Sequence, residues 1–206
     1  MPEDQVSNVR KGSKAVSAFS AILIGLAVLL VLLLLYGVSI YNRLVSLRQS
    51  AREGWSGIDV QLKRRSNLVP NLVETVKGYA KHEKQLFEEV TELRAKTSDA
   101  SSSDANARQE LEGQMSTALM RIFAVAEAYP ELQADKTFIE LQQSLSELEN
   151  QIQMARRYYN GTVRDLNIAV QSFPSNIVAG SFGFVEGSYY EVEHAIERHV
   201  PGVKFD

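Results

Sequence analysis

Cysteine is absent from the 206-residue sequence, so no disulfide stabilises the fold and no cysteine acts as a catalytic nucleophile. The chain also lacks the Gly-x-Ser-x-Gly elbow of serine hydrolases, the Walker phosphate loop and the glycine motif that binds dinucleotides. The sequence therefore contains none of the common signals for hydrolases of these types or for nucleotide-binding enzymes.

Two partial metal motifs lack the residues that would complete them. His82-Glu83 begins like the motif of zinc proteases, but the position four residues after His82 is Leu86. The pair Glu191 and His194 resembles half of a carboxylate site for two metal ions, and no second Glu-x-x-His follows it. We therefore expect no metal, no cofactor, no catalytic residue and no enzymatic activity.

Charged side chains are missing from residues 15–41, a run longer than the roughly 20 apolar residues that cross a bilayer. A cleaved signal peptide has a shorter apolar region, of about 7 to 15 residues. The run predicts a single transmembrane helix at 15–41, preceded by a basic tail at 1–14. Basic residues flank the run on both sides and extend further after it, which favours a cytoplasmic soluble domain and leaves the opposite orientation open.

Charge is distributed unevenly after the membrane segment. Residues 42–96 carry eleven Lys and Arg against seven Asp and Glu, whereas residues 97–206 carry eight against sixteen. A basic region beside a bilayer is attracted to anionic headgroups, by about 1 kcal/mol per residue. The alternative is the solvated face of a helix. The soluble part is acidic overall and lacks a basic stripe with aromatic residues, so we expect a lipid bilayer as partner and no nucleic acid.

Apolar residues from Leu44 to Leu93 recur at spacings of three and four, which predicts one long helix continuing the transmembrane segment. Pro70 interrupts this pattern, because proline lacks the backbone N–H of a helical hydrogen bond. We expect a kink or short break between Asn67 and Asn71.

Residues 97–106 form a Ser-rich connector, after which Asp104 is the expected cap of a second helix that ends at Pro130. A third helix, from Phe138 to Phe173, has heptad spacing. The predicted fold is all-α: the transmembrane helix continues into an elongated antiparallel up-and-down bundle of three long helices, residues 42–174. The tail at 175–206, rich in glycine and aromatics, is expected to be irregular and to dock on the bundle, pair as an edge hairpin or fold on a partner.

Two charged residues, Arg65 and Glu83, occupy positions in the first apolar stripe. In one continuous helix they would lie roughly 27 Å apart, so each needs another partner. The candidates are Glu127 or Glu149 for Arg65, and Arg156 or Arg157 for Glu83. A buried ion pair that fixes the register of the helices is favoured over a catalytic role.

Several stretches of the sequence strongly resemble the LemA family: residues 41–45, 58–83, 127–134 and 155–160. The resemblance runs from the anchor to about Phe184, and the tail beyond about Gly187 has no diagnostic match. It implies a membrane-anchored antiparallel helical bundle in bacteria, at the inner membrane, without an established enzymatic activity. One branch of the family is associated with the biogenesis of magnetosome membranes.

Residues in the matching stretches are candidates for register or interaction. They are Arg64, Arg65, Pro70, Asn71, Glu83, Glu127, Tyr129, Pro130, Arg156, Arg157, Tyr159 and Asn160. The favoured function is a self-assembling coiled-coil scaffold or interaction protein for membrane organisation or biogenesis. The alternative is an adaptor or sensor for another membrane protein, such as a membrane protease, with the tail as its docking element.

Overall fold

The computed structural model describes the backbone of residues 3–99 and 105–190 and the side-chain surroundings of residues 23–97 and 109–190. All regular structure in these residues is helical, which confirms the predicted all-α class. The helices are α1 (Glu3–Tyr79), α2 (Lys84–Asp99), α3 (Ala105–Ala126), α4 (Pro130–Gln133), α5 (Lys136–Gln171) and α6 (Ser175–Phe182). The chain forms two compact units, residues 1–47 with 167–186 and residues 48–166 with 187–206. The predicted cap at Asp104 lies outside the described residues.

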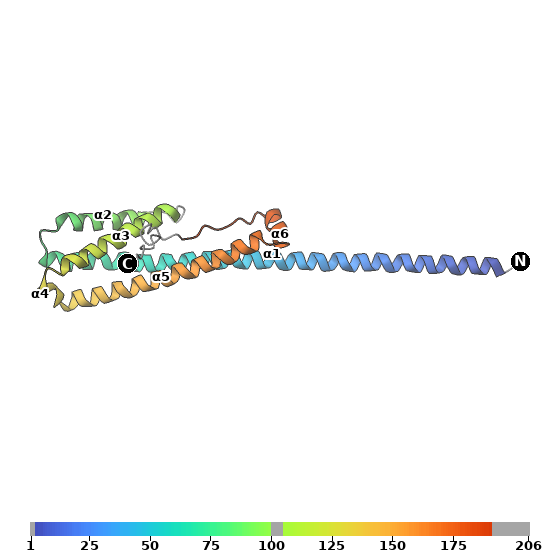
Figure 1. The fold of residues 1–206 in the computed structure, drawn as a ribbon, viewed down its shortest axis with the longest axis horizontal. Coiled ribbons are helices and arrows are strands. Elements are labelled where there is room, and N and C mark those ends of the chain that lie inside the picture. The colour runs from blue at the N-terminus through green and yellow to red at the C-terminus, as the bar shows by residue number, and fades with distance from the viewer. Residues whose placement is uncertain (1–2, 100–104, 191–206) are drawn as a thin grey trace, which may run out of the picture. The chain divides into compact units, whose positions relative to one another are not determined.

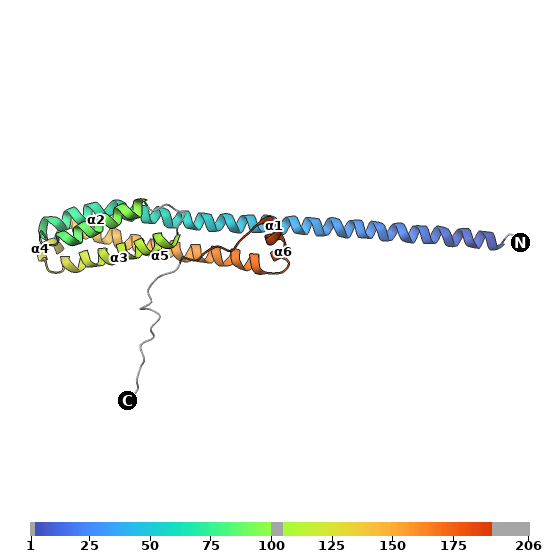
Figure 2. The same ribbon diagram turned by 90° about the horizontal axis from the view of Figure 1, so that it is seen from above.

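The larger unit is an antiparallel bundle. After Arg48, α1 runs to a turn, α2 returns alongside it, and α3 and α5 each reverse direction again, as Figures 1 and 2 show. Its main core gathers apolar side chains from every one of these helices. These include Val69, Leu72, Val76, Leu86, Val90, Met115, Ile122, Phe138 and Leu141.

The predicted single helix from Leu44 to Leu93 is instead two helices. Helix α1 ends at Tyr79, residues 80–83 form a turn, and α2 begins at Lys84. Ala80 is fully buried in this turn, and the N–H of Glu83 donates to its carbonyl at 3.2 Å. The bundle therefore contains α2 as a further long helix beyond the three predicted.

Of the predicted kink or short break at Pro70, the break is absent, since α1 continues through this residue to Tyr79. The carbonyl of Ser66, four residues earlier, accepts a hydrogen bond from Arg94 of α2 at 2.9 Å. A donor from a neighbouring helix thus replaces the N–H that proline lacks.

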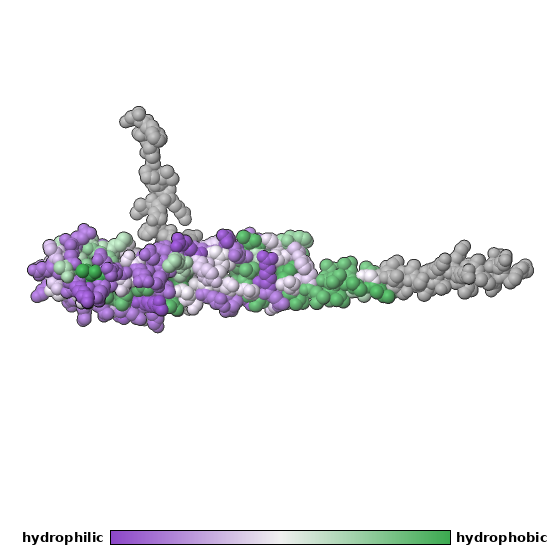
Figure 3. Space-filling model, turned by 90° about the horizontal axis from the view of Figure 1, so that it is seen from below, coloured by the Kyte–Doolittle hydropathy of each residue, from purple (hydrophilic) through white to green (hydrophobic). Residues whose placement is uncertain are grey.

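The smaller unit contains the membrane segment. Within the described residues, the stretch of α1 from Leu23 is the one helix long and apolar enough to cross a membrane. Its side chains between Leu23 and Leu35 are largely exposed, and Figure 3 shows them as a continuous hydrophobic surface. This surface is the one that a bilayer would cover.

The start of the predicted irregular tail is helical, so that prediction is wrong for residues 175–182. Helix α6 packs on α1 and the end of α5 through a small cluster that includes Leu44, Ala169 and Ala179. Gly183 ends α6 with a φ of 68°, a left-handed conformation that favours glycine, and the N–H of Phe184 donates to the carbonyl of Ala179 at 2.9 Å. These contacts fix the path of the chain after α5.

Candidate functional site

A cluster of charged side chains lies buried between α1, α3 and α5. The guanidinium of Arg65 donates to the carboxylate of Glu112, to Glu149 Oε2 at 2.9 Å and to Ser116 Oγ at 2.8 Å. Arg65 and Glu112 are each only 1% exposed, whereas Glu149 is half-buried. We refer to these residues as the Arg65 cluster.

The Arg65 cluster joins three helices by charge-assisted hydrogen bonds. Removing one partner from such a cluster leaves an uncompensated charge in the core, so its geometry constrains how the helices align. The predicted pairing of Arg65 with Glu149 is confirmed, the alternative partner Glu127 is not used, and Glu112 was not predicted. Within the described residues, no group of three or more His, Asp or Glu side chains is placed to hold a metal ion.

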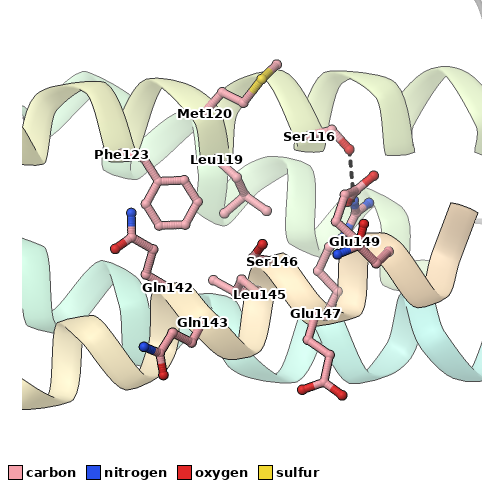
Figure 4. A pocket seen from close by; sticks show the side chains of 12 residues that line it. Ser116, Leu119, Met120, Phe123, Gln142, Gln143, Leu145, Ser146, Glu147 and Glu149 are labelled. Carbon is pink, nitrogen blue, oxygen red and sulfur yellow. Dashed lines mark hydrogen bonds and ion pairs between the residues drawn. The ribbon is translucent and has the colours of Figure 1, made fainter.

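An open groove of about 840 Å³ lies beside the cluster, between α3 and α5. In Figure 4, Leu119 and Phe123 of α3 face Leu145 of α5, and Ser116, which accepts a hydrogen bond from Arg65, lies at one end. Met120, which also lines this α3–α5 groove, is 61% exposed. The remaining lining residues are polar: Gln142, Gln143, Ser146, Glu147, Glu149 and Asn150.

A second groove, of about 730 Å³, lies between α1 and α2. Its lining contains the apolar side chains of Val73 and Phe87 and five charged side chains, Lys77, Lys81, Lys84, Glu88 and Glu92. Lys84 approaches Glu88 at 3.7 Å, while Lys77 and Lys81 form no ion pair with any described residue. Glu92 pairs with Lys96 at 2.7 Å, so the charged groups of this α1–α2 groove that have no ion pair among the described residues are Lys77 and Lys81.

A third feature holds the end of the described chain on the bundle. The side-chain amide of Asn160 pairs with both backbone groups of Tyr190: Nδ2 donates to its carbonyl at 3.0 Å, and its N–H donates to Oδ1 at 2.8 Å. The hydroxyl of Tyr159 donates to the carbonyl of Ser188 at 2.8 Å. Together with Trp55 and Arg156, Tyr159 and Asn160 form what we term the C-terminal clasp. It holds residues 187–190.

The side chain of Tyr190 fills the clasp and is only 3% exposed. Its ring lies 6.1 Å from that of Trp55 and 4.6 Å below the guanidinium of Arg156, and it packs against Ile58 and Ile152. Burial raises the pKa of Tyr190, and the nearby positive charge of Arg156 partly opposes that rise. Tyr190 is thus an aromatic anchor between helices α1 and α5.

The sequence pattern of the LemA family matches residues 54–205. The chain belongs to the LemA family.

Magnetosome protein MamQ 2 of Paramagnetospirillum magneticum is 26% identical over 179 residues, which cover 75% of this chain and 66% of that protein. MamQ of Magnetospirillum gryphiswaldense is 25% identical with the same coverage, so the chain spans slightly less than two thirds of these relatives. Protein LemA of Metamycoplasma hominis is 25% identical over 157 residues, covering 76% of this chain and 71% of its own.

With its apolar N-terminal helix, this LemA-family chain is a membrane-associated helical protein. The family pattern reaches residue 205, further into the tail than the resemblance in the sequence had indicated, and it begins after the membrane segment. The bundle from residue 54 onward and the C-terminal clasp both lie within the matched residues. The motif at 155–160 contributes Arg156, Tyr159 and Asn160 to the clasp.

Glu83 has a different role from the predicted ion pair with Arg156 or Arg157. It precedes α2, and its carbonyl accepts the N–H of Phe87 at 3.2 Å, so it starts that helix. Its carboxylate forms no ion pair with any described residue, and Arg156 lies against Tyr190 instead. The predicted partnership is therefore wrong.

Other LemA residues proposed from the sequence lie on the surface or at turns. Exposed side chains without an ion pair in the described part of the chain are Arg64, Asn71, Glu127 and Arg157. Half-buried Tyr129 precedes α4, which Pro130 begins at its first position, where a missing N–H is harmless. The structure does not bring these residues into one site with the Arg65 cluster.

Two important residues were missed from the sequence, Glu112 and Arg94. The buried face of α3 follows Glu112, Met115, Leu119, Ile122 and Ala126, with spacings of three, four, three and four. The sequence has an apolar residue at Leu111, from which an apolar face can also be counted. Counting the face from Glu112 instead would have placed a carboxylate in the core opposite Arg65.

Proposed function

We propose that this chain is a membrane-anchored scaffold that associates with further copies of itself, without enzymatic activity, and helps to organise a membrane. The bundle would stand on the cytoplasmic side of a bacterial inner membrane. The observation that supports association is the presence of two open grooves on one bundle. The lining of one has more carboxylates than basic groups, and in the other the charges without an ion pair among the described residues are lysines.

The α3–α5 groove is acidic in balance. The positive charge of Arg65 is matched by Glu112, which leaves the carboxylates of Glu147 and Glu149 along a groove that also contains apolar side chains. In the α1–α2 groove, Lys77 and Lys81 have no ion-pair partner among the described residues. The lysine-bearing face of a second copy would complement these carboxylates and cover the exposed Met120.

The two grooves share no residue, so contact between them is heterologous. When two copies associate through a heterologous contact, one copy keeps a free α1–α2 groove and the other keeps a free α3–α5 groove. Further copies can bind at these free grooves, which gives a ring or an open array. Apolar burial in the grooves supplies affinity, and the complementary charges orient the copies.

A role in membrane organisation has support from the relatives. Relatives that are 25% to 26% identical to this chain carry the name magnetosome protein. This is support by analogy, since one fold hosts many functions. The self-association proposal rests on the grooves and stands independently of it.

A pair of methionine variants tests the proposal. Met120 lines the α3–α5 groove, whereas Met154 is similarly exposed, at 54%, and lies outside both grooves. In full-length protein reconstituted in lipid vesicles, we expect energy transfer between labelled copies that rises with protein density. Met120→Arg should weaken this association by about tenfold, the effect of losing roughly 1.4 kcal/mol of contact energy. Met154→Arg should leave it unchanged.

Charge exchange provides the second arm of the test. Lys81→Glu alone and Glu147→Lys alone should each reduce association, and mixing the two variants should restore part of it, since a reversed pair then forms between copies. Wild-type protein that shows no energy transfer at the highest density would overturn the proposal, as would equal effects of the two methionine variants.

A further inference from the structure

The C-terminal clasp recognises the backbone of an extended chain. Asn160 and Tyr159 form hydrogen bonds with the backbone groups of Ser188 and Tyr190. The side chains of Ser188 and Tyr189 are exposed, so only Tyr190 is recognised through its side chain. Pairing with backbone groups and a pocket for one side chain is the usual manner in which proteins bind extended peptides.

The pocket for Tyr190 is built by helices and not by the segment it holds. Trp55 and Ile58 come from α1, and Ile152, Arg156 and Tyr159 from α5. Residues 187–190 belong to no helix or strand, and Val185 and Glu186 before them are exposed. Residues 187–190 thus bind to the helices as a peptide ligand would, although they belong to the same chain.

We propose that the C-terminal clasp is a peptide-binding site whose ligand is the extended Gly187–Tyr190 segment, and that two copies exchange this segment. The inference builds on the proposed self-association and adds a second way of linking copies. The contacts made between copies are the same as those within one chain. The ratio of exchanged to unexchanged segments therefore depends on the effective concentration of the second copy. Anchoring the copies in a common membrane raises that concentration and favours exchange.

The absence of cysteine from the chain makes exchange directly observable. A Cβ atom on residue 187 would lie 3.4 Å from Val163 Cγ1, so side chains at these two positions are in van der Waals contact, as a disulfide between them requires. We would place Val163→Cys in one tagged full-length copy and Gly187→Cys in a differently tagged copy, and oxidise them together in lipid vesicles. A disulfide joining the two tags is expected, and it should appear only when the copies share a membrane.

Three further samples make the outcome decisive. A single chain carrying both cysteines should form an internal disulfide, which shows that the substituted clasp folds and closes. Adding Asn160→Leu to the copy with Val163→Cys should lower the yield between copies by about fivefold, whereas Met154→Arg should not change it. Efficient internal disulfides without any between the tagged copies would overturn the inference.

The same vesicles separate this inference from the proposed function. Energy transfer between copies without a 163–187 disulfide would refute segment exchange and leave association through the grooves intact. A disulfide between copies that persists with Met120→Arg, while groove-dependent association is lost, would support exchange alone. Absence of both signals would contradict both proposals.

Discussion

The side chain of Arg94 donates a hydrogen bond of 2.9 Å from Nε to the backbone carbonyl of Ser66. In a regular helix this carbonyl would accept the N–H of residue 70, and residue 70 is proline. Arg94 of α2 therefore satisfies an acceptor that α1 cannot satisfy itself. This contact explains why α1 continues through Pro70, and it couples the proline to a residue on the neighbouring helix.

A double-mutant cycle tests this coupling. Arg94→Met should cost about 1.5 to 3 kcal/mol, the usual value of a hydrogen bond to a charged group. In the Pro70→Ala background the helix supplies its own N–H to Ser66, so the same change should cost clearly less. Urea unfolding of the full chain in detergent, followed by the fluorescence of the single tryptophan, Trp55, measures both.

The control for the cycle is Arg121→Met. Arg121 forms an exposed ion pair with Glu89 at 2.7 Å, which is expected to contribute less than about 1 kcal/mol in either background. An Arg94→Met cost that is equal with proline and alanine at position 70 would show that the two residues are not coupled.

The helical class and most of the buried face were predictable, because apolar spacings of three and four persist along the chain. The turn between α1 and α2 was not, for a geometric reason. It spans residues 80–83, about one helical turn, so the apolar stripe resumes at Leu86 in nearly the same phase. No proline marks this turn, and only the return of α2 alongside α1 reveals it.

The candidate sites were predictable to different extents. Arg65 was identified because a charged residue interrupts an apolar stripe. Since a buried charge without a partner is costly, an ion pair with a carboxylate was expected for it. The roles of Tyr159 and Asn160 in the C-terminal clasp depend on a segment about 30 residues later, with no periodic pattern to indicate where it lies. Contacts between a helix and an extended segment leave no spacing signal in the sequence.

Glu112 should be essential for the stability of the bundle. Glu112→Ala leaves Arg65 in the core with only the half-buried Glu149, so we expect a loss of about 3 to 5 kcal/mol of unfolding free energy. Replacing Arg65 and Glu112 together by leucine should recover much of this loss, since no uncompensated charge remains buried.

Glu147→Ala is the matched control for this prediction, because Glu147 is an exposed carboxylate on the groove. It should change stability by less than about 0.5 kcal/mol. Tryptophan-detected urea unfolding gives all three values, and similar stabilities for Glu112→Ala and Glu147→Ala would exclude a structural role for the buried pair.

Two glycines of α1 should respond differently to the same substitution. A Cβ on Gly54 would lie 3.1 Å from Tyr159 Cα, whereas nothing lies within 4 Å of a Cβ on Gly57. Gly57→Ala should raise stability by about 1 kcal/mol through helix propensity. Gly54→Ala should be less stable than Gly57→Ala, because the helices must separate to relieve a contact with backbone. Equal midpoints in thermal unfolding would show that α1 and α5 do not approach closely at Gly54.

Asp135 joins the start of α5 to the end of α1. Its Oδ1 accepts the N–H of Phe138 at 3.0 Å, and its Oδ2 accepts the hydroxyl of Tyr79 at 3.0 Å. The bond from Phe138 and then that from Tyr79 lower the pKa of Asp135, because both favour the ionised carboxylate. The same hydrogen bond and the negative charge of Asp135 raise the pKa of Tyr79.

These two shifts predict a stability that depends on pH at both ends of the range. Because the folded pKa of Asp135 is below its unfolded value of about 3.9, its contribution is present above that value and is lost as the pH falls through the folded pKa. Because the folded pKa of Tyr79 is above its unfolded value of about 10, its contribution is present below pH 10 and is lost as the pH rises through the folded pKa. Tyr79→Phe should remove the alkaline loss and weaken the acidic one, and Asp135→Ala should remove both. Urea midpoints of wild type and variants between pH 3 and 11 measure this, and a wild-type alkaline loss that survives in Tyr79→Phe would assign that loss to other groups.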